Sequence, residues 1–126
     1  MKKPTRKSLV KQLDVAFSRW VRLRHADEHG NTTCWTCGKQ DHYKNMHAGH
    51  FQSRMKYSTR WDEQNVQTQC PACNLWNQGE QYRFGIELDA HYGTGTANEI
   101  TIRSNRTRKF TDAELKELIE KYRVPA

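Results

Sequence analysis

The sequence predicts a small α+β protein with a core that is closed by one zinc ion and flanked by α-helices. Two Cys-x-x-Cys pairs enclose residues 38–69, and helical periodicity of apolar residues appears on both sides of this region. Hydrophobic residues make up 35% of the 126 residues, and the mean hydropathy is −1.05. A chain of this length with so few apolar residues builds only a modest core. We therefore expect the metal to supply much of the folding free energy.

We expect one domain over residues 1–126, with a basic N-terminal helix at 1–30, a zinc-closed core at 31–93, and a basic segment with a helix at 94–126. The formal net charge is +7, and residues 1–25, with eight Lys or Arg residues against Asp14, carry an equally large surplus. Such a local surplus indicates a polyanionic partner, and nucleic acid is favoured over an anionic membrane surface. No apolar run approaches membrane-spanning length and no signal-peptide core follows Met1, so we expect a cytosolic protein.

The first predicted helix extends from Ser8, its expected N-cap, to Gly30. Its apolar stripe repeats every three or four residues and comprises Leu9, Leu13, Ala16, Phe17, Trp20 and Val21. We interpret this stripe as the core-facing side of the helix. The opposite side is either solvated or in contact with phosphates, and the local charge surplus favours phosphate contacts. The candidate nucleic-acid-binding residues on this helix are Lys11, Arg19, Arg22 and Arg24.

The four cysteines of the chain, Cys34, Cys37, Cys70 and Cys73, form the two Cys-x-x-Cys pairs. Four thiolates presented by two tight turns suit one tetrahedral zinc ion, and a reducing cytosol favours metal over disulfides. Around the first pair, residues 32–35 are β-prone, and residues 39–48 are expected to form a loop that leads into a strand. We expect His42 in this loop to be a surface residue without a partner.

The segment 47–50, which contains His47, Gly49 and His50, is the sharpest chemical signal in the chain. Two histidines at this spacing can be metal ligands, a general base, or residues without a catalytic role. Their position inside the metal-closed loop favours a functional role.

Three cations follow this segment: Arg54, Lys56 and Arg60. They belong either to a solvated loop or to a phosphate-binding rim. A turn is predicted at residues 61–66, where Asn65 can bond backbone groups across the turn.

A second helix is predicted from Pro71 to His91. The residues that share one side of it are Leu75, Tyr82, Ile86 and Leu88/Asp89. Gly79 and Gly85 weaken this helix by about 1 kcal/mol each, and Gly79 can break it. Gly93 and Gly95 end the segment.

Residues 98–106 fit a helix or a strand, and a second cationic patch follows with Arg103, Arg106, Arg108 and Lys109. The last helix begins at Thr111, which with Glu114 has the pattern of a capping box, and is expected to stop at Pro125. Its predicted buried stripe is Leu115, Leu118, Ile119 and Tyr122.

These residues suit hydrolysis of a phosphodiester bond, which requires a base near neutral pKa and a divalent cation that neutralises developing charge. His50 can be the base. Asn74 directly follows the last cysteine, and its amide oxygen can bind a hard ion such as Mg²⁺. Zinc on the four sulfurs would fix the start of the helix that carries Asn74, and would place this side chain opposite His50.

Five phrases of the chain resemble the lambda NinG (Rap) family of phage recombination proteins: AFSRWVRLRHAD (16–27), CWTCGK (34–39), HAGHFQSR (47–54), TRWDEQNVQTQCPACN (59–74) and GEQYR (79–83). The similarity covers roughly residues 14–93. The order of CxxC, Gly-His, an internal Asn and CxxC-Asn also looks like the HNH, or ββα-metal, nucleases and is similar to the phage endonuclease VII resolvases. The resemblance implies a zinc-stapled ββα-metal core, in which a β-hairpin carries the general base and the following helix carries the metal ligand.

The resemblance further implies structure-specific cleavage of branched DNA, such as Holliday junctions or D-loops, in the cytoplasm of a bacterial host. A homodimer is compatible with it. In this scheme His50 is the base, Asn65 braces the hairpin, Asn74 holds Mg²⁺ or Mn²⁺, and Arg54 or Arg60 steadies the scissile phosphate.

One position departs from the HNH pattern, because Gly49 stands where these nucleases usually place a metal-binding Asp. The divalent ion would then be bound by Asn74 alone or by Asn74 together with His47. The alternative reading is a zinc-ribbon module that binds nucleic acid without catalysis, which needs the cysteines and the basic residues but neither His50 nor Asn74.

Overall fold

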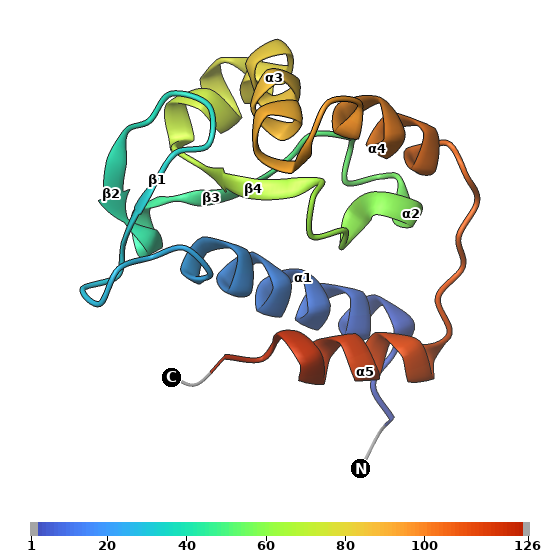
Figure 1. Cartoon of the computed structure of the whole chain (residues 1–126). Coiled ribbons are helices and arrows are strands. Elements are labelled where there is room, and N and C mark those ends of the chain that lie inside the picture. The colour runs from blue at the N-terminus through green and yellow to red at the C-terminus, as the bar shows by residue number, and fades with distance from the viewer. Residues whose placement is uncertain (1–2, 125–126) are drawn as a thin grey trace.

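The computed structural model describes residues 3–124, which form a mixed α+β fold in three layers (Figure 1). Helices α1 (Arg6–Leu23) and α5 (Asp112–Tyr122) lie side by side in one layer. Strands β3 (His47–His50) and β4 (Val66–Gln69) form the middle layer, and helices α3 (Gln81–Tyr92) and α4 (Thr96–Ser104) lie on the other side. This confirms the predicted α+β class. Within residues 3–124, no helix combines the length and the apolar character needed to span a membrane.

Helix α1 has the predicted apolar side but different ends. Leu9, Leu13, Phe17 and Val21 are buried along it. The prediction of Ser8 as N-cap was wrong, because the Thr5 hydroxyl accepts a hydrogen bond from the Ser8 amide and the helix begins at Arg6. The prediction that the helix ends at Gly30 was also wrong. The carboxylate of Asp27 accepts hydrogen bonds from the amides of His29 and Asn31, which stabilises a turn in place of further helix.

The main core lies between α1 and α5. Leu115, Ile119 and Tyr122 of α5 are buried against the apolar side of α1, and the ring of Tyr122 meets Phe17 edge-on at a centroid distance of 4.7 Å. The capping box of Thr111 and Glu114 is confirmed at the start of α5. Leu118 is only partly buried at the edge of this core, and Pro125 lies outside the described residues.

A small antiparallel pair, β1 (Asn31–Thr33) and β2 (Gln40–His42), flanks the first cysteine turn, with one strand before Cys34 and the other after Cys37. A short 3₁₀ turn, Tyr43–Asn45, leads into β3. The prediction that His42 has no partner was wrong. Its Nδ1 accepts a hydrogen bond from the Lys44 amide, and its ring packs on Tyr43, so it caps the 3₁₀ turn.

Strands β3 and β4 pair antiparallel, with His47 opposite Gln69 and His50 opposite Val66. The chain between them contains the one-turn helix α2 (Tyr57–Arg60). All residues of β4 are buried, since this strand is covered on both sides. The paired strands β3 and β4 therefore hold His50 at the end of β3, beside the buried strand β4.

The single helix predicted from Pro71 to His91 was wrong. The chain forms a π-helical turn at Ala72–Trp76 and a 3₁₀ turn at Gln78–Glu80 before α3 begins. The break occurs where Gln78, Gly79 and Glu80 have φ angles of 54°, 78° and 49°, which a continuous helix does not allow. The predicted shared side is only partly right, since Leu88 is buried whereas Leu75, Tyr82 and Ile86 are exposed. Phe84, which was not on that side, is buried with Leu88 against Ile100 of α4.

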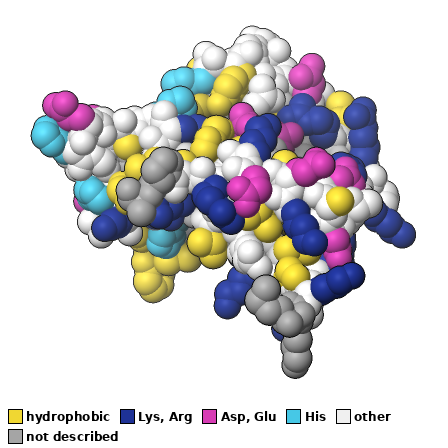
Figure 2. All heavy atoms as spheres, turned by 90° about the horizontal axis from the view of Figure 1, so that it is seen from below, with side chains coloured by type: hydrophobic (Ala, Val, Ile, Leu, Met, Phe, Trp, Pro, Cys, Tyr) yellow, Lys and Arg dark blue, Asp and Glu magenta, His cyan; other side chains and the backbone are white. Residues whose placement is uncertain are grey.

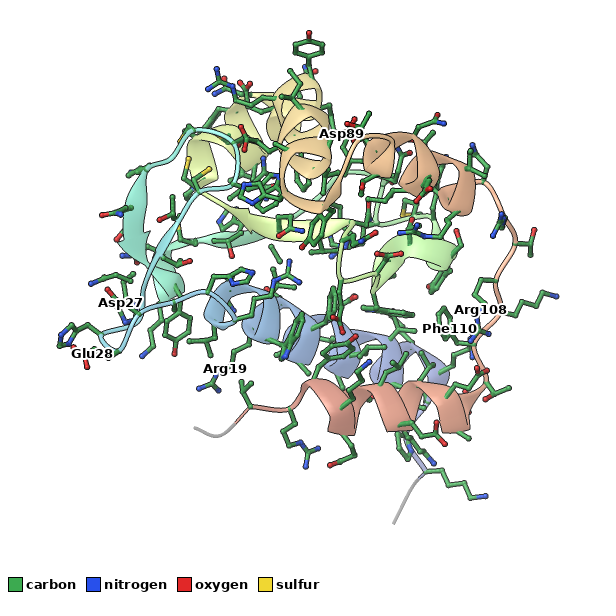
Figure 3. The ribbon with its side chains drawn as sticks, in the orientation of Figure 1. Arg19, Asp27, Glu28, Asp89, Arg108 and Phe110 are labelled. Atoms are coloured by element: carbon green, nitrogen blue, oxygen red, sulfur yellow. The ribbon has the colours of Figure 1, made fainter. Side chains whose placement is uncertain are left out.

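Helix α4 resolves the ambiguity at residues 98–106 in favour of a helix. The carboxylate of Asp89 in α3 accepts a hydrogen bond from the Ala97 amide at the start of α4. Asp89 lies where the end of α3 meets the start of α4 (Figure 3). The two helices are thereby joined at a sharp corner that runs through Gly93 and Gly95.

Candidate functional site

The four cysteines come together as predicted. Their sulfur atoms all lie within 4.8 Å of one another, and none is in a disulfide. The sulfurs of Cys37 and Cys70 are 3.6 Å apart, close to the roughly 3.8 Å edge of a tetrahedron with Zn–S bonds of about 2.3 Å. Cys34, Cys70 and Cys73 are buried together with Met46, whereas Cys37 is exposed. The donor set and its spacing therefore fit one zinc ion.

Each cysteine pair sits in a turn closed by a backbone hydrogen bond. The Gly38 amide donates to the Cys34 carbonyl, and the Asn74 amide donates to the Cys70 carbonyl. The Trp35 amide also donates to the Thr68 carbonyl, at 2.7 Å, which ties the first turn to β4. A metal held by both turns would thus fix the backbone of Asn74, the residue directly after the last sulfur.

A cleft of about 420 Å³ brings together four of the predicted site residues, namely His50, Arg54, Arg60 and Asn74. Asp14 and Ser18 of α1 form part of its wall, together with Gln78 and Gln81 near the helix break. His50 and Asn74, predicted to lie opposite each other, both line this one cleft. His47 and Asn65 do not line it.

His50 is held by the backbone of α2. Its Nε2 lies 3.0 Å from the carbonyl oxygen of Arg60, and because a carbonyl only accepts, Nε2 carries the hydrogen in the neutral ring. The other nitrogen, Nδ1, is then an unprotonated acceptor. Burial lowers the pKa of His50 below its ordinary value of 6.5, while the Arg60 carbonyl and the charge of Asp14 act in the opposite direction. His50 is therefore mainly neutral, and able to accept a proton, at pH 7.

Asn74 is held by His47. The Nδ2 atom of Asn74 lies 3.1 Å from Nδ1 of His47. An amide nitrogen donates, so this bond uses the nitrogen side of the Asn74 amide and leaves Oδ1 as the acceptor side. His47 thus contacts the predicted metal ligand directly.

The two candidate phosphate-binding arginines have different environments. Arg54 is exposed in the loop before α2 and lines the cleft. Arg60 is only 8% exposed, and its guanidinium donates to both carboxylate oxygens of Asp14, at 3.1 and 2.6 Å, and to the Arg54 carbonyl at 3.1 Å. Of the two arginines predicted as alternatives for phosphate contact, this geometry favours Arg54, because three of the five N–H groups of Arg60 bond inside the protein.

Asn65 braces the loop between β3 and β4. Its side chain is fully buried. Oδ1 accepts from the Gln52 amide at 2.7 Å, and Nδ2 donates to the carbonyls of Gln52 and Thr59 at 3.1 and 2.9 Å. Asn65 thus bonds backbone groups, but those of Gln52 and Thr59, which lie outside the predicted turn at residues 61–66.

Several predicted nucleic-acid-binding residues make hydrogen bonds or ion pairs within the protein. Arg24 donates to the carbonyls of Glu63 and Val66 and to the Gln67 side chain, and Arg22 donates to the Tyr43 carbonyl. Arg103 pairs with Asp62 at 2.9 Å, and Lys56 donates to the Asn105 side chain. Arg108 pairs with Glu114 and lies over the Phe110 ring, 4.1 Å from its centroid (Figure 3).

The remaining predicted cations are Lys11, Arg19 and Arg106. Lys11 and Arg106 are exposed, and Arg19 points from α1 away from the strands (Figure 3). On the face formed by α1 and α5, Lys and Arg side chains alternate with acidic and hydrophobic ones and form no continuous basic surface (Figure 2).

The sequence analysis missed Asp14 and Gln81 as cleft residues. Asp14 makes three hydrogen bonds inside the protein, and Gln81 lies 3.3 Å from the His50 carbonyl. The sequence did contain an indication that Asp14 has a specific role, since it is the only acidic residue in the basic segment 1–25 and lies next to the buried Leu13.

Residues 1–125 match a family model described as "Bacteriophage Lambda NinG protein". The chain is similar to proteins named ninG from three phages. It is 29% identical over 114 residues to that of Escherichia phage 933W, which covers 90% of this chain and 54% of the relative. Identity is 28% to the protein of Escherichia phage lambda and 27% to that of Salmonella phage P22, each over 90% of this chain and 53% of the relative.

The chain thus spans about half the length of the curated relatives it matches. No solved structure matches the chain.

Proposed function

Since this chain belongs to the bacteriophage lambda NinG family, we propose that it is a metal-dependent DNA endonuclease of the HNH, or ββα-metal, type. The proposal rests on one observation above others. His50, with its Nε2 committed to a backbone carbonyl, lines the same cleft as Asn74 and the exposed Arg54. A general base, an amide oxygen and a free cation are the groups that phosphodiester hydrolysis requires.

In this proposal His50 takes a proton from the attacking water through Nδ1. The hydrogen bond from Nε2 to Arg60 keeps the ring in the required tautomer. Arg54 contacts the scissile phosphate with its exposed guanidinium, which can make paired hydrogen bonds to phosphate oxygens.

Asn74 would hold a divalent ion, Mg²⁺ or Mn²⁺, through Oδ1. The fit rests on the His47 bond, which occupies Nδ2 and leaves a hard oxygen as the acceptor side of the amide. Such an ion supplies charge neutralisation at the phosphate and at the leaving oxygen.

The order of the elements supports the HNH relationship. A strand that carries His50 pairs with β4, and the helical turn that carries Asn74 begins within the second cysteine pair and includes Cys73. The family membership and the formal net charge of +7 support branched DNA, such as Holliday junctions or D-loops, as substrate in the cytoplasm of the bacterial host.

The test compares a four-way junction with duplex and single strands of the same sequence, in Mg²⁺ or Mn²⁺ and in EDTA, with zinc content checked throughout. We expect metal-dependent cutting that is strongest on the junction. His50→Ala should lower the cleavage rate by about 10²–10⁴-fold and still bind the junction. The control His29→Ala, at an exposed position that does not line the cleft, should leave the cleavage rate unchanged.

A His50 variant that cuts as fast as the parent, with contaminating nuclease excluded, would refute the site. Binding of the junction by a parent protein that never cuts it would instead support the zinc-ribbon module without catalysis.

A further inference from the structure

The N-terminal helix contributes one carboxylate, Asp14, to the cleft. Its two oxygens accept hydrogen bonds from Nε and Nη2 of Arg60 at 3.1 and 2.6 Å, and Oδ1 also accepts from the indole nitrogen of Trp61 at 3.0 Å. The Asp14 side chain is 24% exposed and that of Arg60 is 9% exposed. This is a partly dehydrated ion pair between α1 and α2, with the directional geometry of a paired Arg–carboxylate contact.

Arg60 in turn contacts two of the residues to which the proposed reaction assigns a role, His50 and Arg54. Its backbone carbonyl accepts the hydrogen bond from His50, and its Nη1 donates to the carbonyl of Arg54. Its guanidinium also lies over the rings of Tyr57 and Trp61, at 5.1 and 5.5 Å from their centroids. The position of Arg60 therefore decides where the His50 ring and the Arg54 loop lie.

Helix α2 cannot hold Arg60 by itself. It comprises only residues Tyr57–Arg60 and has no side-chain N-cap bond, and a single helical turn is unstable without tertiary contacts. Two neighbouring residues fix the end of this turn to the long, well-packed helix α1: Arg60 through its ion pair with Asp14, and Trp61, the C-cap of α2, through its burial against α1 and its own bond to Asp14.

We propose that Asp14 is a positioning residue of this cleft, which through Arg60 holds His50 and the Arg54 loop in the arrangement that DNA cleavage requires. The inference rests on the proposed function. It assigns Arg60 to positioning rather than to phosphate contact, and it makes the N-terminal helix a part of the active site.

The charged groups that face His50 come from three segments: Asp14 from α1, Arg54 from the loop, and Arg60 from α2. Asp14 and the bond to the Arg60 carbonyl raise the pKa of His50, whereas burial and the two arginine charges lower it. Replacing Asp14 by Asn removes a negative charge from beside a buried imidazole. The pKa of His50 should then fall further, and the acidic limb of the rate profile should move to lower pH.

The experiment uses Asp14→Asn in the full chain. We expect kcat on a four-way junction to fall by about 10- to 100-fold, because misplacing a catalytic group by about 1 Å has effects of this size. KM should change little. The ¹⁵N shifts of the His50 ring, recorded without DNA, should show loss of the single Nε2–H tautomer and a lower pKa.

The matched control is Asp112→Asn. Asp112 also pairs with an arginine of α1, Arg6, but at 3.4 Å and with both side chains at least half exposed and away from the cleft. This variant should leave kcat, the pH profile and the His50 spectrum as in the parent.

Zinc content and the melting curve show whether Asp14→Asn folds. Should it fail to fold, the experiment uses Arg60→Lys, which keeps the backbone and the charge but loses the paired geometry. The measurements are again kcat, KM and the ¹⁵N spectrum of His50. Parent-like kcat and an unchanged His50 spectrum in the folded variant would overturn the inference. A rise of the His50 pKa towards 6.5 would also overturn it, since that indicates that the site has only opened to water.

The two proposals fail in distinguishable ways. A parent protein that cuts no DNA refutes the proposed function, whereas the His50 tautomer and its pKa test the positioning role without any cleavage assay.

Discussion

A side chain at position 49 would collide with Gln69. A Cβ built on Gly49 lies 1.8 Å from Oε1 and 2.6 Å from Cδ of Gln69. Gln69 is fully buried, and its Nε2 donates to the Thr36 hydroxyl at 3.1 Å and to the Gly79 carbonyl at 2.8 Å. It thereby joins the first cysteine turn to the helix break at the cleft. Gly49 leaves the space for this link, which is a physical reason for the absence of Asp at this position.

We therefore expect Gly49→Ala to destabilise the fold by about 1–3 kcal/mol, the usual effect of overpacking a buried site. The measurement is a double-mutant cycle with Gln69→Ala, followed by thermal or urea unfolding. In the Gln69→Ala background the added methyl group should cost much less, because the colliding side chain is absent. Equal costs in both backgrounds would contradict the steric explanation.

The zinc site should be necessary for folding. Cys73→Ser removes a buried sulfur and Cys37→Ser an exposed one, and either change leaves three thiolates for a four-coordinate ion. Both variants should lose zinc or unfold, as measured by metal analysis and circular dichroism. A parent protein that is folded, reduced and free of zinc would show this prediction to be wrong.

Cleavage should depend on pH through His50. Burial is the largest influence on the pKa of His50 and lowers it, so the neutral base persists below the ordinary pKa of 6.5. We expect the rate to be level near neutral pH and to fall on acidification with an apparent pKa below 6.5. A rate that instead falls with an apparent pKa above 6.5 would be incompatible with a buried, neutral base.

The bond between His47 and Asn74 should control metal affinity. Asn74→Ala removes the proposed ligand and should abolish cleavage at any Mg²⁺ or Mn²⁺ concentration while zinc remains bound. His47→Ala removes only the partner at 3.1 Å, so the Asn74 amide can rotate and more metal is needed.

A metal titration of the cleavage rate separates the two variants. The rate of His47→Ala should recover at high Mn²⁺, and that of Asn74→Ala should not. If His47→Ala needs the same metal concentration for cleavage as the parent, His47 has only a structural role.

The basic residues should divide into structural and DNA-binding groups. Arg24→Glu breaks three hydrogen bonds to Glu63, Val66 and Gln67 and should reduce the free energy of unfolding by more than about 2 kcal/mol. Lys11→Glu, at an exposed position of α1, should leave stability unchanged and weaken DNA binding.

The binding measurement is the salt dependence of affinity, whose slope falls by about 1 for each lost phosphate contact. Parent-like affinity and slope in Lys11→Glu would show that α1 does not contact DNA through this residue.

Much of the fold follows from local patterns in the sequence. The spacing of Leu9, Leu13 and Phe17 predicted the buried side of α1, and the pair Thr111 and Glu114 predicted the start of α5. The metal cluster was predictable because two Cys-x-x-Cys turns have few ways to satisfy four thiols. The same metal cluster predicted that His50 and Asn74 share a cleft, since Asn74 directly follows the zinc ligand Cys73.

The tertiary structure decided which charged residues are free. Arg54 and Arg60 are alike in sequence, yet only Arg60 meets a carboxylate, and that carboxylate lies 46 positions away in α1. A hydrogen bond forms only where packing brings both groups within about 3 Å, so the partner of a long polar side chain is set by the fold and not by its own segment.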